Sequence, residues 1–517
     1  MSAKTFPYRP PHPAPENIQG ESAPEAVPGG GRLRAALAVF LSAMTVFRYY
    51  YILHGYLNLD PDEAHYWEWS RHLAIGYYSK GPVIAWLIRA GTLLFGNTEI
   101  GVRCLAPVLY LLGSVLLYSL GRELFDEKTG IFSAALYQVV PLFSAFGVIM
   151  TIDAPTVFFW ILSLWSFMRA LNRQKAASWM LLGAAVGMGM LTKLTMSFFI
   201  LSVFLYMISS REGRRELGSI RPWLGFLVCL VLLVPLFYWN SRHNWVNFRH
   251  EEGHLNWAAG IHVSAGSFLQ FLGSQLGVVT PVLFALIIYA LAKTKKEEAG
   301  RFCFWFAAPT LVFFFLKSIF LGKVQANWAM LAYVTGLIAA APLILRGLAP
   351  GTRPGGRFFM SLAPALAVLV TAVSYYPSLI GLPPRLDPSA RLRGWRQLAA
   401  AVEENAPPPP YFVFSNYYGA SSELAFYLKG NPLTYCADTG QRMNQYDLWP
   451  GFEGFKRQNA VFVTIGSADM PHVVANAFRS CSKKTLIETE KGKRLCVFTI
   501  FTCYDFRGMR EKPAKTF

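Results

Sequence analysis

Residues 35–69 read AALAVFLSAMTVFRYYYILHGYLNLDPDEAHYWEW, a long apolar run that passes directly into a stretch rich in acids and aromatic rings. A predominantly apolar segment of about 20 residues is the signature of a membrane-spanning helix. Asp60, Asp62, Glu63 and Glu68 follow where such a helix would meet water, and charged groups beside a bilayer tend to mark function. The simpler alternative is a solvated loop whose aromatic residues belong to the membrane-interface belt.

The composition of the whole chain agrees with a membrane protein. Of the 517 residues, 53% are apolar and 15% are charged, whereas soluble proteins carry about 25% charged residues. The net charge of +18 suits basic cytoplasmic loops and anionic lipid headgroups, and the chain has no nucleic-acid-binding motif. We therefore predict a polytopic α-helical membrane protein that does not bind nucleic acid.

Hydropathy predicts about 11 membrane spans. The fifth and sixth share one apolar stretch, which Thr192-Lys193-Leu194-Thr195 interrupts. The segment Pro82–Phe95 is apolar but short, so it could lie along the interface. The predicted spans are 35–55, 102–121, 130–149, 153–171, 178–192, 194–210, 223–240, 267–292, 302–321, 327–345 and 358–378.

Lysine and arginine residues near the span ends predict the orientation, because such residues accumulate in cytoplasmic loops. Basic residues cluster at 32–34, 122–128, 169–175, 211–221, 293–301 and 346–357. The opposite set of loops comprises 56–81, the Asp153 turn, Lys193, 241–265 and 322–326. We expect this second set to be extracytoplasmic, with the C-terminus on the same side because the span count is odd.

The chain divides into three predicted parts. Residues 1–31 are rich in Pro, Gly, Ala and Glu, which predicts a disordered cytoplasmic tail. Residues 32–380 form the transmembrane part. Residues 385–517 alternate helix-like and strand-like segments, which predicts an extracytoplasmic α/β domain. Helices are expected at 389–405, 420–429 and 471–480, and strands at 411–415, 460–465, 485–489 and 495–503.

The seven cysteines show no metal-binding spacing. Four of them lie in the C-terminal part, where a disulfide can persist only if that part is extracytoplasmic. The sequence does not say which of Cys436, Cys481, Cys496 and Cys503 would pair.

Acidic and basic residues from distant segments are predicted to meet on the outer membrane face. A carboxylate can accept a proton from an acceptor hydroxyl, and Lys or Arg can stabilise a departing phosphate. This combination favours group transfer with an anionic leaving group. The candidates are Asp62, Glu63 and Asp153 as catalytic acids; Lys80, Lys193, Arg242, Arg249 and Lys323 as phosphate ligands; and His65, Tyr66, Asn327 and Trp328 as substrate contacts.

Each candidate also has a structural alternative. Asp153 precedes Ala-Pro and could simply begin a helix. Lys80 and Lys193 could extend along the interface to reach water. Arg249 and its flanking histidines could be ordinary loop charge, and Trp328 could be a belt residue. Asp60 and Glu68 are expected to be structural or solvated.

Three motifs resemble bacterial glycosyltransferases of the GT-C fold, in the protein O-mannosyltransferase-like superfamily. They are Asp62-Glu63-Ala64-His65-Tyr66-Trp67, Tyr78-Ser79-Lys80-Gly81-Pro82 and Thr151-Ile152-Asp153-Ala154-Pro155. The surroundings of Lys193 and of Lys323–Trp328 also match, and the resemblance covers about residues 35–345. Many relatives have His-Pro-Pro where this chain has Lys80-Gly81-Pro82. The group includes the aminoarabinose transferase of lipid A and galacturonosyltransferases of rhizobial lipopolysaccharide.

The resemblance implies an inverting transfer of a sugar from a polyprenyl-phosphate donor in the bacterial inner membrane, on the periplasmic side. The matching first-loop acid, Asp62 or Glu63, would lie at the catalytic centre, with Asp153 as a second acid and Lys80 near the donor phosphate. The acceptor could be lipid A, a glycan or a protein. No metal is obligatory, although clustered carboxylates could bind Mg²⁺ or Mn²⁺.

Two other functions are compatible with the sequence. A transporter or flippase of a lipid-linked saccharide would also need many spans, but the chain shows no inverted repeat or paired broken helices. The third reading is a sensor or assembly protein with a periplasmic domain.

Overall fold

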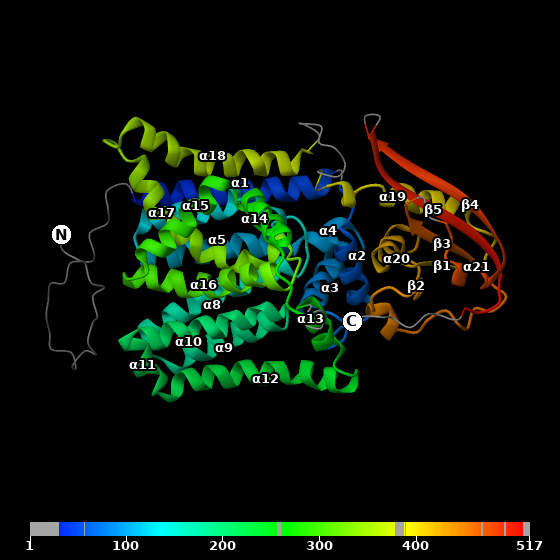
Figure 1. Cartoon of the computed structure of the whole chain (residues 1–517), viewed down its shortest axis with the longest axis horizontal. Helices are drawn as coiled ribbons and strands as arrows, with labels where there is room; N and C mark the ends of the chain where they lie inside the picture. The colour runs from blue at the N-terminus through cyan, green and yellow to red at the C-terminus, as the bar shows by residue number, and fades with distance from the viewer. Residues whose placement is uncertain are drawn as a thin grey trace.

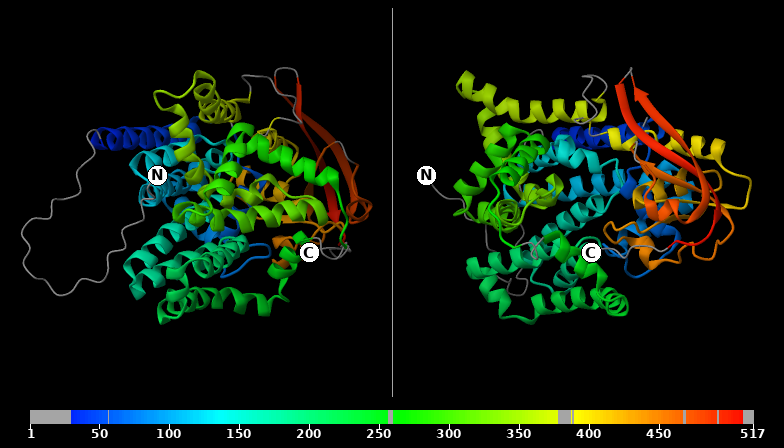
Figure 2. Two further views of the ribbon diagram at one scale, coloured as in Figure 1. Left: turned by 60° about the vertical axis from the view of Figure 1, so that its left-hand side comes forward. Right: turned by 45° about the vertical axis from the view of Figure 1, so that its right-hand side comes forward.

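The computed structural model describes residues 30–509, apart from 56, 256–259, 378–386, 388, 467–468 and 491–492. A body of roughly parallel helices carries a smaller α/β domain at one end, and the two parts stay side by side in all views (Figures 1 and 2). The predicted N-terminal tail and the predicted boundary at 380–385 lie outside the described residues.

The described residues contain seven helical segments long and apolar enough to cross a membrane, or nine if two bent pairs each count as one span. The expectation of about 11 spans was therefore too high, by these criteria of length and composition. The seven are α1 (Gly30–His54), α4 with α5 (Glu99–Leu124), α8 (Asp153–Arg173), α12 (Ile220–Arg242), α16 (Glu298–Phe320), η3 with α17 (Ala326–Leu348) and α18 (Pro354–Tyr375).

Helix breaks explain most of the difference. The predicted span 130–149 is divided into α6 (Glu127–Val139) and α7 (Pro141–Phe146), because the Pro141 nitrogen cannot continue the helical hydrogen bonds. The predicted span 267–292 consists of α14 (Ala265–Val279) and α15 (Pro281–Thr294), which meet at 100°. Thr280 has φ of +76° at this bend. The predicted span 178–192 is α9 (Ala176–Met190), which has only 15 residues.

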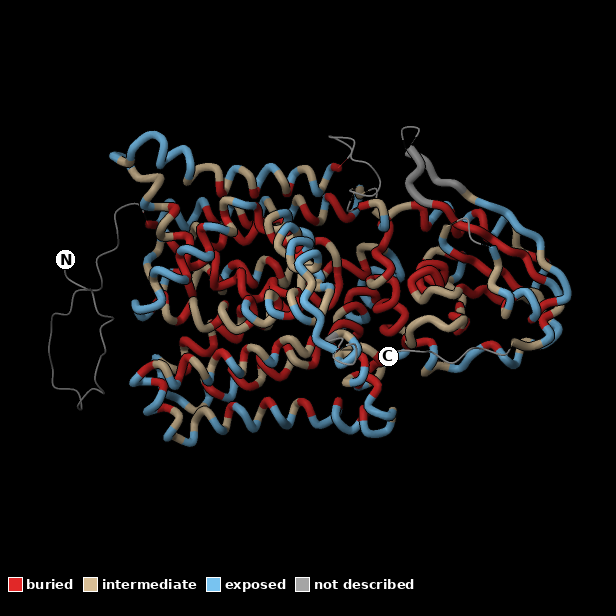
Figure 3. The backbone as a smooth tube through the Cα atoms, viewed as in Figure 1, coloured by how far each residue is buried: buried red, intermediate tan, exposed pale blue. Residues whose placement is uncertain are grey.

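The helical body presents apolar side chains outward, as lipid contact requires. Phe226, Val231 and Val234 of α12 and Phe358 and Leu369 of α18 are all exposed. Figure 3 shows both helices largely exposed along their length, whereas the interior of the body is buried. A water-soluble protein rarely leaves such continuous apolar surfaces uncovered.

Short helices gather at the end of the body that faces the α/β domain (Figure 1). They are α2 (Pro61–Arg71), α3 (Val83–Phe95), α4 (Glu99–Arg103) and α13 (Val246–Leu255). The segments predicted to be extracytoplasmic thus meet at one end. The remaining helices are η1 (Leu194–Met196), which leads into α10 (Ser197–Ser209), and α11 (Arg211–Leu217), which turns by 114° from α10.

The C-terminal part is an α/β domain, as predicted. Its sheet has the order β2-β1-β3-β5-β4, with β1 parallel to β2 and β3, and β5 antiparallel to β3 and β4. The helix predicted at 471–480 is wrong in length: α21 spans only His472–Ala475, and β4 begins at Phe478. The other elements are η5 (Ala390–Leu392), α19 (Trp395–Asn405), β1 (Tyr411–Ser415), α20 (Tyr418–Tyr427), β2 (Thr434–Cys436), η6 (Gln445–Leu448), β3 (Asn459–Ile465), β4 (Phe478–Glu490) and β5 (Lys493–Phe506).

One disulfide joins Cys481 of β4 to Cys503 of β5, which face each other across the two strands. Cys436 is buried and takes no part in this disulfide. The side chain of Cys496 lies outside the described residues.

Candidate active site

A cavity of about 680 Å³ lies where the short helices of the body meet the C-terminal domain. The segments that line it are far apart in the chain: α2, the loops around 79, 151, 194 and 327, α13, α16 and the C-terminal domain. Eight of the predicted site residues line this cavity. They are Asp62, His65, Tyr66, Lys80, Asp153, Lys193, Asn327 and Trp328.

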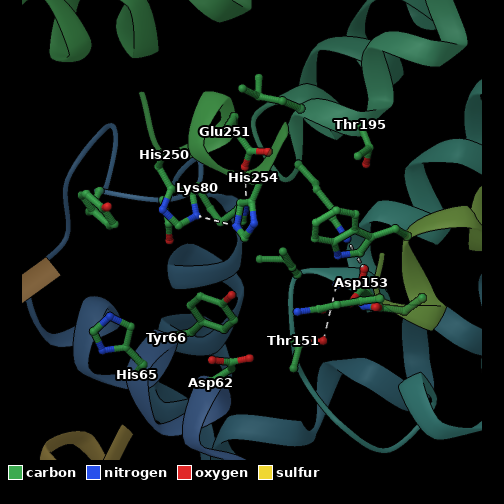
Figure 4. Close-up of a pocket in the computed structure, with 18 of the residues that line it drawn as sticks. Asp62, His65, Tyr66, Lys80, Thr151, Asp153, Thr195, His250, Glu251 and His254 are labelled. Atoms are coloured by element: carbon green, nitrogen blue, oxygen red, sulfur yellow. Dashed lines mark hydrogen bonds and ion pairs between the residues drawn. The ribbon is translucent and has the colours of Figure 1, made fainter. Parts of the chain in front are cut away.

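Local sequence explains how α2 presents its residues. Asp60 caps the helix by accepting a hydrogen bond from the Asp62 amide, and Pro61 suits the first helical position. Asp62 and Tyr66 are four residues apart and therefore share one helix face. Figure 4 shows the Asp62 carboxylate and the Tyr66 ring at the same side of the cavity.

Asp62 combines a fixed position with access to the cavity. Its Oδ1 accepts a hydrogen bond of 2.9 Å from the Tyr418 hydroxyl, and its Oδ2 lies 3.9 Å from Arg391. The side chain remains 40% exposed. An ionised carboxylate with a partner on one oxygen can still accept a hydrogen bond or proton through the other.

Asp60 lies beside it and pairs with Arg391 at 2.8 Å. Burial, together with the neighbouring charge of Asp62, raises the pKa of Asp60 to about 7, although Arg391 acts in the opposite direction. Asp60 therefore carries only part of its charge at neutral pH. Asp60 caps α2 and pairs with Arg391, which agrees with the expectation that it is structural.

Asp153 and Lys193 form a buried ion pair at the opposite part of the cavity wall, with Lys193 Nζ 2.8 Å from Asp153 Oδ1. Asn327 Nδ2 donates to the other carboxylate oxygen at 2.7 Å. Asp153 thus does begin α8, as the structural alternative held, but its carboxylate also bridges Lys193 and Asn327. The arrangement fixes one cation and one amide in the cavity.

Lys80 pairs with Glu251 of α13 in the same cavity. Burial by itself would raise the pKa of Glu251, but the adjacent Lys80 ammonium holds it below its usual value. His254 lies one helical turn further on, and burial followed by the charge of Lys80 lowers its pKa to about 4. Burial likewise lowers the pKa of His250, which contacts Arg442 and His254. Both rings are therefore neutral at neutral pH.

Lys317 also lines the cavity, although no sequence motif singled it out. Its side chain is 3% exposed, and its ammonium lies 5.3 Å from the centre of the Trp328 ring. Lys317 Nζ donates to the Lys323 carbonyl at 3.2 Å. No carboxylate among the described residues forms an ion pair with it. An ammonium held in this way can face an anionic ligand.

Glu63 points away from the cavity, so its prediction as a catalytic acid is not supported by its location. Its side chain is fully buried and pairs with Arg103 at 2.6 Å. It also accepts hydrogen bonds from the Met150 amide at 2.7 Å and the Asp60 amide at 2.9 Å. Glu63 instead closes the capping box of α2 and ties the first loop to neighbouring segments.

Three predicted phosphate ligands also do not line this cavity. Arg242, at the end of α12, and Arg249, on α13, are both exposed. Lys323 lines a second cavity of about 710 Å³, which shares His254, Lys317, Gln325 and Trp328 with the first. Their predicted role in donor binding therefore has no support from the cavity geometry.

Several functional candidates come from the C-terminal domain, for which the sequence offered no signal. Arg391, Tyr418, Arg442 and Gln445 all line the cavity. Gln445 accepts a hydrogen bond of 2.7 Å from the Tyr78 amide, two residues before Lys80. The docking of two distant parts of the chain places these groups, and sequence periodicity does not reveal such docking.

Within the part of the chain that the structure describes, no group of three or more His, Cys, Asp or Glu side chains could hold a metal ion. The carboxylates of Asp153 and Glu251 are instead paired with lysines. The expectation that no metal is obligatory, with Mg²⁺ or Mn²⁺ possible, stays a prediction for an assay with and without added metal.

Solved structures share the fold over most of the chain. ArnT from Cupriavidus metallidurans, in its apo state, aligns with a TM-score of 0.62 over 90% of this chain and 98% of that chain, at 17% identity. An Archaeoglobus fulgidus oligosaccharyltransferase aligns with a TM-score of 0.53 over 84% of this chain and 69% of that chain, at 13% identity. The chain has the GT-C fold. The fold class predicted from the sequence is confirmed.

Sequence comparisons agree with the resemblance. The family described as dolichyl-phosphate-mannose-protein mannosyltransferase matches residues 79–239. A lipid A galacturonosyltransferase, RgtD of Rhizobium johnstonii, is 28% identical over 298 residues, which is 56% of this chain and 62% of that protein. An undecaprenyl phosphate-α-4-amino-4-deoxy-L-arabinose arabinosyl transferase of Pseudomonas aeruginosa is 31% identical over 192 residues, covering 33% of this chain and 35% of that protein. The matched region thus spans less than two thirds of each of these two relatives.

Proposed function

We propose that this protein is an inverting membrane glycosyltransferase that moves a sugar from a polyprenyl-phosphate donor to lipid A, with a glycan or a protein as alternative acceptors. The observation that carries the proposal is one cavity that holds the accessible Asp62 carboxylate together with Lys80, Lys193 and Lys317. The names of the relatives support this choice, since RgtD is a lipid A galacturonosyltransferase and the GT-C neighbour ArnT has also been crystallised with undecaprenyl phosphate.

The proposed reaction breaks the bond between the anomeric carbon and the donor phosphate oxygen. An acceptor oxygen attacks the anomeric carbon from the opposite face, and the polyprenyl phosphate leaves with the bonding electron pair. If the acceptor is a hydroxyl, its proton passes to Asp62, a step that typically contributes about 10²–10⁴-fold in rate. Lys80 and Lys317 are suited to stabilise the charge that grows on the departing phosphate.

A phosphate acceptor would change the role of Asp62. The phosphate of lipid A is already ionised, so it needs no base, and Asp62 would then orient the acceptor and the sugar hydroxyls. Asp153 is less accessible, because Lys193 and Asn327 occupy both of its oxygens. We assign Asp153 the role of holding those two side chains in the cavity.

We further propose that the cavity and the C-terminal domain face the periplasm from the bacterial inner membrane. The distribution of basic residues supports this orientation. The disulfide between Cys481 and Cys503 also supports it, since such bonds persist in oxidising compartments.

The test uses the full-length protein purified in detergent and in sealed vesicles. It is given lipid A and radiolabelled undecaprenyl-phosphate sugars, with 4-amino-4-deoxy-L-arabinose and galacturonic acid as the two sugars. The proposal expects labelled lipid A whose mass has increased by one sugar residue. Movement of labelled donor across vesicles without any covalent product would instead identify a flippase.

A further inference from the structure

The C-terminal domain is docked tightly on the helix that carries Asp62. Helix α20 packs along α2, where His65 Nδ1 lies 3.0 Å from Ser422 Oγ. The contact is close at Gly419, since a Cβ there would lie 2.7 Å from the Pro61 Cβ. Because only glycine fits this position, the first turn of α20 is held against the first turn of α2.

Further contacts on both sides of this turn fix its position. The Tyr427 hydroxyl accepts a hydrogen bond of 2.8 Å from the Leu59 amide, just before α2. Arg71, at the other end of α2, donates to the Asn431 carbonyl at 2.9 Å. These contacts join α20 and the segment after it to α2 and the residue before it, so a side chain at the start of α20 has a defined position relative to α2.

Tyr418 uses this position to reach the cavity. Its hydroxyl donates a hydrogen bond of 2.9 Å to Asp62 Oδ1, across 356 residues of sequence. Burial, followed by the charge of Asp62, raises the pKa of Tyr418 well above its ordinary value. The hydroxyl is thus protonated over the whole working pH range and can act only as a donor toward an ionised carboxylate.

We propose that Tyr418 is a positioning residue for the transfer reaction: its hydroxyl holds the Asp62 carboxylate in one orientation, so the C-terminal domain completes the active site. The inference rests on the proposed function, because it assigns Tyr418 a part in that reaction. It also gives the C-terminal domain a role, which neither the sequence nor the relatives assign.

The proposal includes a pH dependence, so the groups facing Asp62 matter. Arg391, from η5, lies 3.9 Å from Asp62 Oδ2 and also pairs with the neighbouring Asp60 at 2.8 Å. Tyr66 and Tyr417 are neutral neighbours, and burial raises the pKa of both. Among these groups, Tyr418 is the one that forms a hydrogen bond to the carboxylate within the described residues.

The test compares the full-length wild-type protein with Tyr418→Phe in the lipid A transfer assay, from pH 5 to pH 9. The variant lacks only the hydroxyl oxygen that is attached to the ring. A hydrogen bond to a charged group has an effect of roughly 10-fold to 100-fold. We expect kcat to fall by about that factor at neutral pH, with little change in KM for the donor. We also expect the pH profile of the variant to differ from that of wild type, because the lost hydrogen bond acts on the carboxylate that takes part in the reaction.

Tyr435→Phe is the matched control. Tyr435 lies in β2 of the same domain, and its hydroxyl forms no hydrogen bond with the described residues. It should therefore retain the wild-type rate and pH profile. The thermal midpoint of each variant shows whether Tyr418→Phe remains folded.

A second measurement covers the case in which Tyr418→Phe is inactive. Starting from Asp62→Asn, the further change Tyr418→Phe should leave the residual rate unchanged within about 2-fold, because the hydrogen bond acts through the carboxylate. A wild-type rate and pH profile for Tyr418→Phe would overturn the inference while leaving the transferase proposal intact. If the wild-type protein itself makes no labelled product, the proposed function fails instead.

Discussion

Glu63→Gln is the substitution that best distinguishes the structural role of Glu63 from the catalytic role of its neighbour Asp62. Glu63 is fully buried, and the Arg103 side chain that it contacts is 3% exposed. Arg103 Nη2 lies 2.6 Å from Glu63 Oε2, and Arg103 Nε lies 2.9 Å from Oε1. The Met150 amide donates to the same carboxylate at 2.7 Å. Glutamine has almost the same shape but removes the negative charge from this cluster of donors.

We expect Glu63→Gln to lower the free energy of unfolding strongly, because the charged Arg103 side chain remains buried without its partner. Breaking a buried ion pair by removing one partner destabilises a protein by about 3–5 kcal/mol. Asp62→Asn removes a charge from a side chain that is 40% exposed, so it should cost only about 1 kcal/mol or less. The two neighbouring substitutions should therefore differ clearly in stability.

Both variants are purified in the same detergent, heated, and analysed by size-exclusion chromatography for the fraction that remains folded. We expect a strongly lowered midpoint for Glu63→Gln and a nearly unchanged midpoint for Asp62→Asn. Adding Arg103→Met to Glu63→Gln removes the unpaired charge and should restore part of the stability. The reasoning is refuted if Glu63→Gln keeps the wild-type midpoint but loses transfer, because Glu63 would then be catalytic.

Two further changes test separate parts of the account. Lys80→Met removes a cavity ammonium that pairs with Glu251, and it should weaken binding of undecaprenyl phosphate by about 10-fold or more, as measured by competition with a labelled donor. Burial lowers the pKa of His65 from 6.5 to about 3, so its neutral ring is the form that the folded protein stabilises. The measurement is the thermal midpoint of wild type and of His65→Gln between pH 3 and about pH 7. Wild type should have the higher midpoint above about pH 6.5, and this difference should be lost as the pH falls toward 3. A difference in midpoint that stays constant over this range would contradict the buried neutral ring.

The sequence predicted the site well where a motif lies at the end of an apolar segment. Asp62, Lys80, Asp153 and Lys193 were selected because topology places their segments on one membrane face, and all four line the cavity. The same reasoning could not separate Asp62 from Glu63, since topology does not resolve two consecutive residues on one helix. A local signal was present, because Asp60 followed three residues later by Glu63 is a capping-box pattern.

The number of spans was overestimated for a related reason. Hydropathy counts apolar residues but does not detect that Pro141 and Pro281 begin new helices. Each proline lacks the amide hydrogen that a continuing helix needs, so these apolar stretches divide or bend. The positions of these two prolines therefore indicated helix breaks, which a count of apolar residues does not detect.

The contribution of the C-terminal domain could not be predicted from local patterns. Tyr418 reaches the cavity because α20 docks on α2, and Gln445 of η6 reaches it through the Tyr78 amide, each over more than 350 residues of sequence. Neither residue lies in a recognisable motif. Docking of this kind depends on the shapes of two folded surfaces, which hydropathy and spacing do not encode directly.

The most direct measurement for the central claim is the initial rate of covalent sugar transfer to lipid A by purified wild-type protein and by Asp62→Asn, at saturating labelled donor. The account predicts a product for wild type and a rate lower by about 10²–10⁴-fold for Asp62→Asn when the acceptor group is a hydroxyl. Binding of undecaprenyl phosphate and the thermal midpoint should be nearly equal in the two proteins. An Asp62→Asn protein that transfers sugar at the wild-type rate would contradict the account.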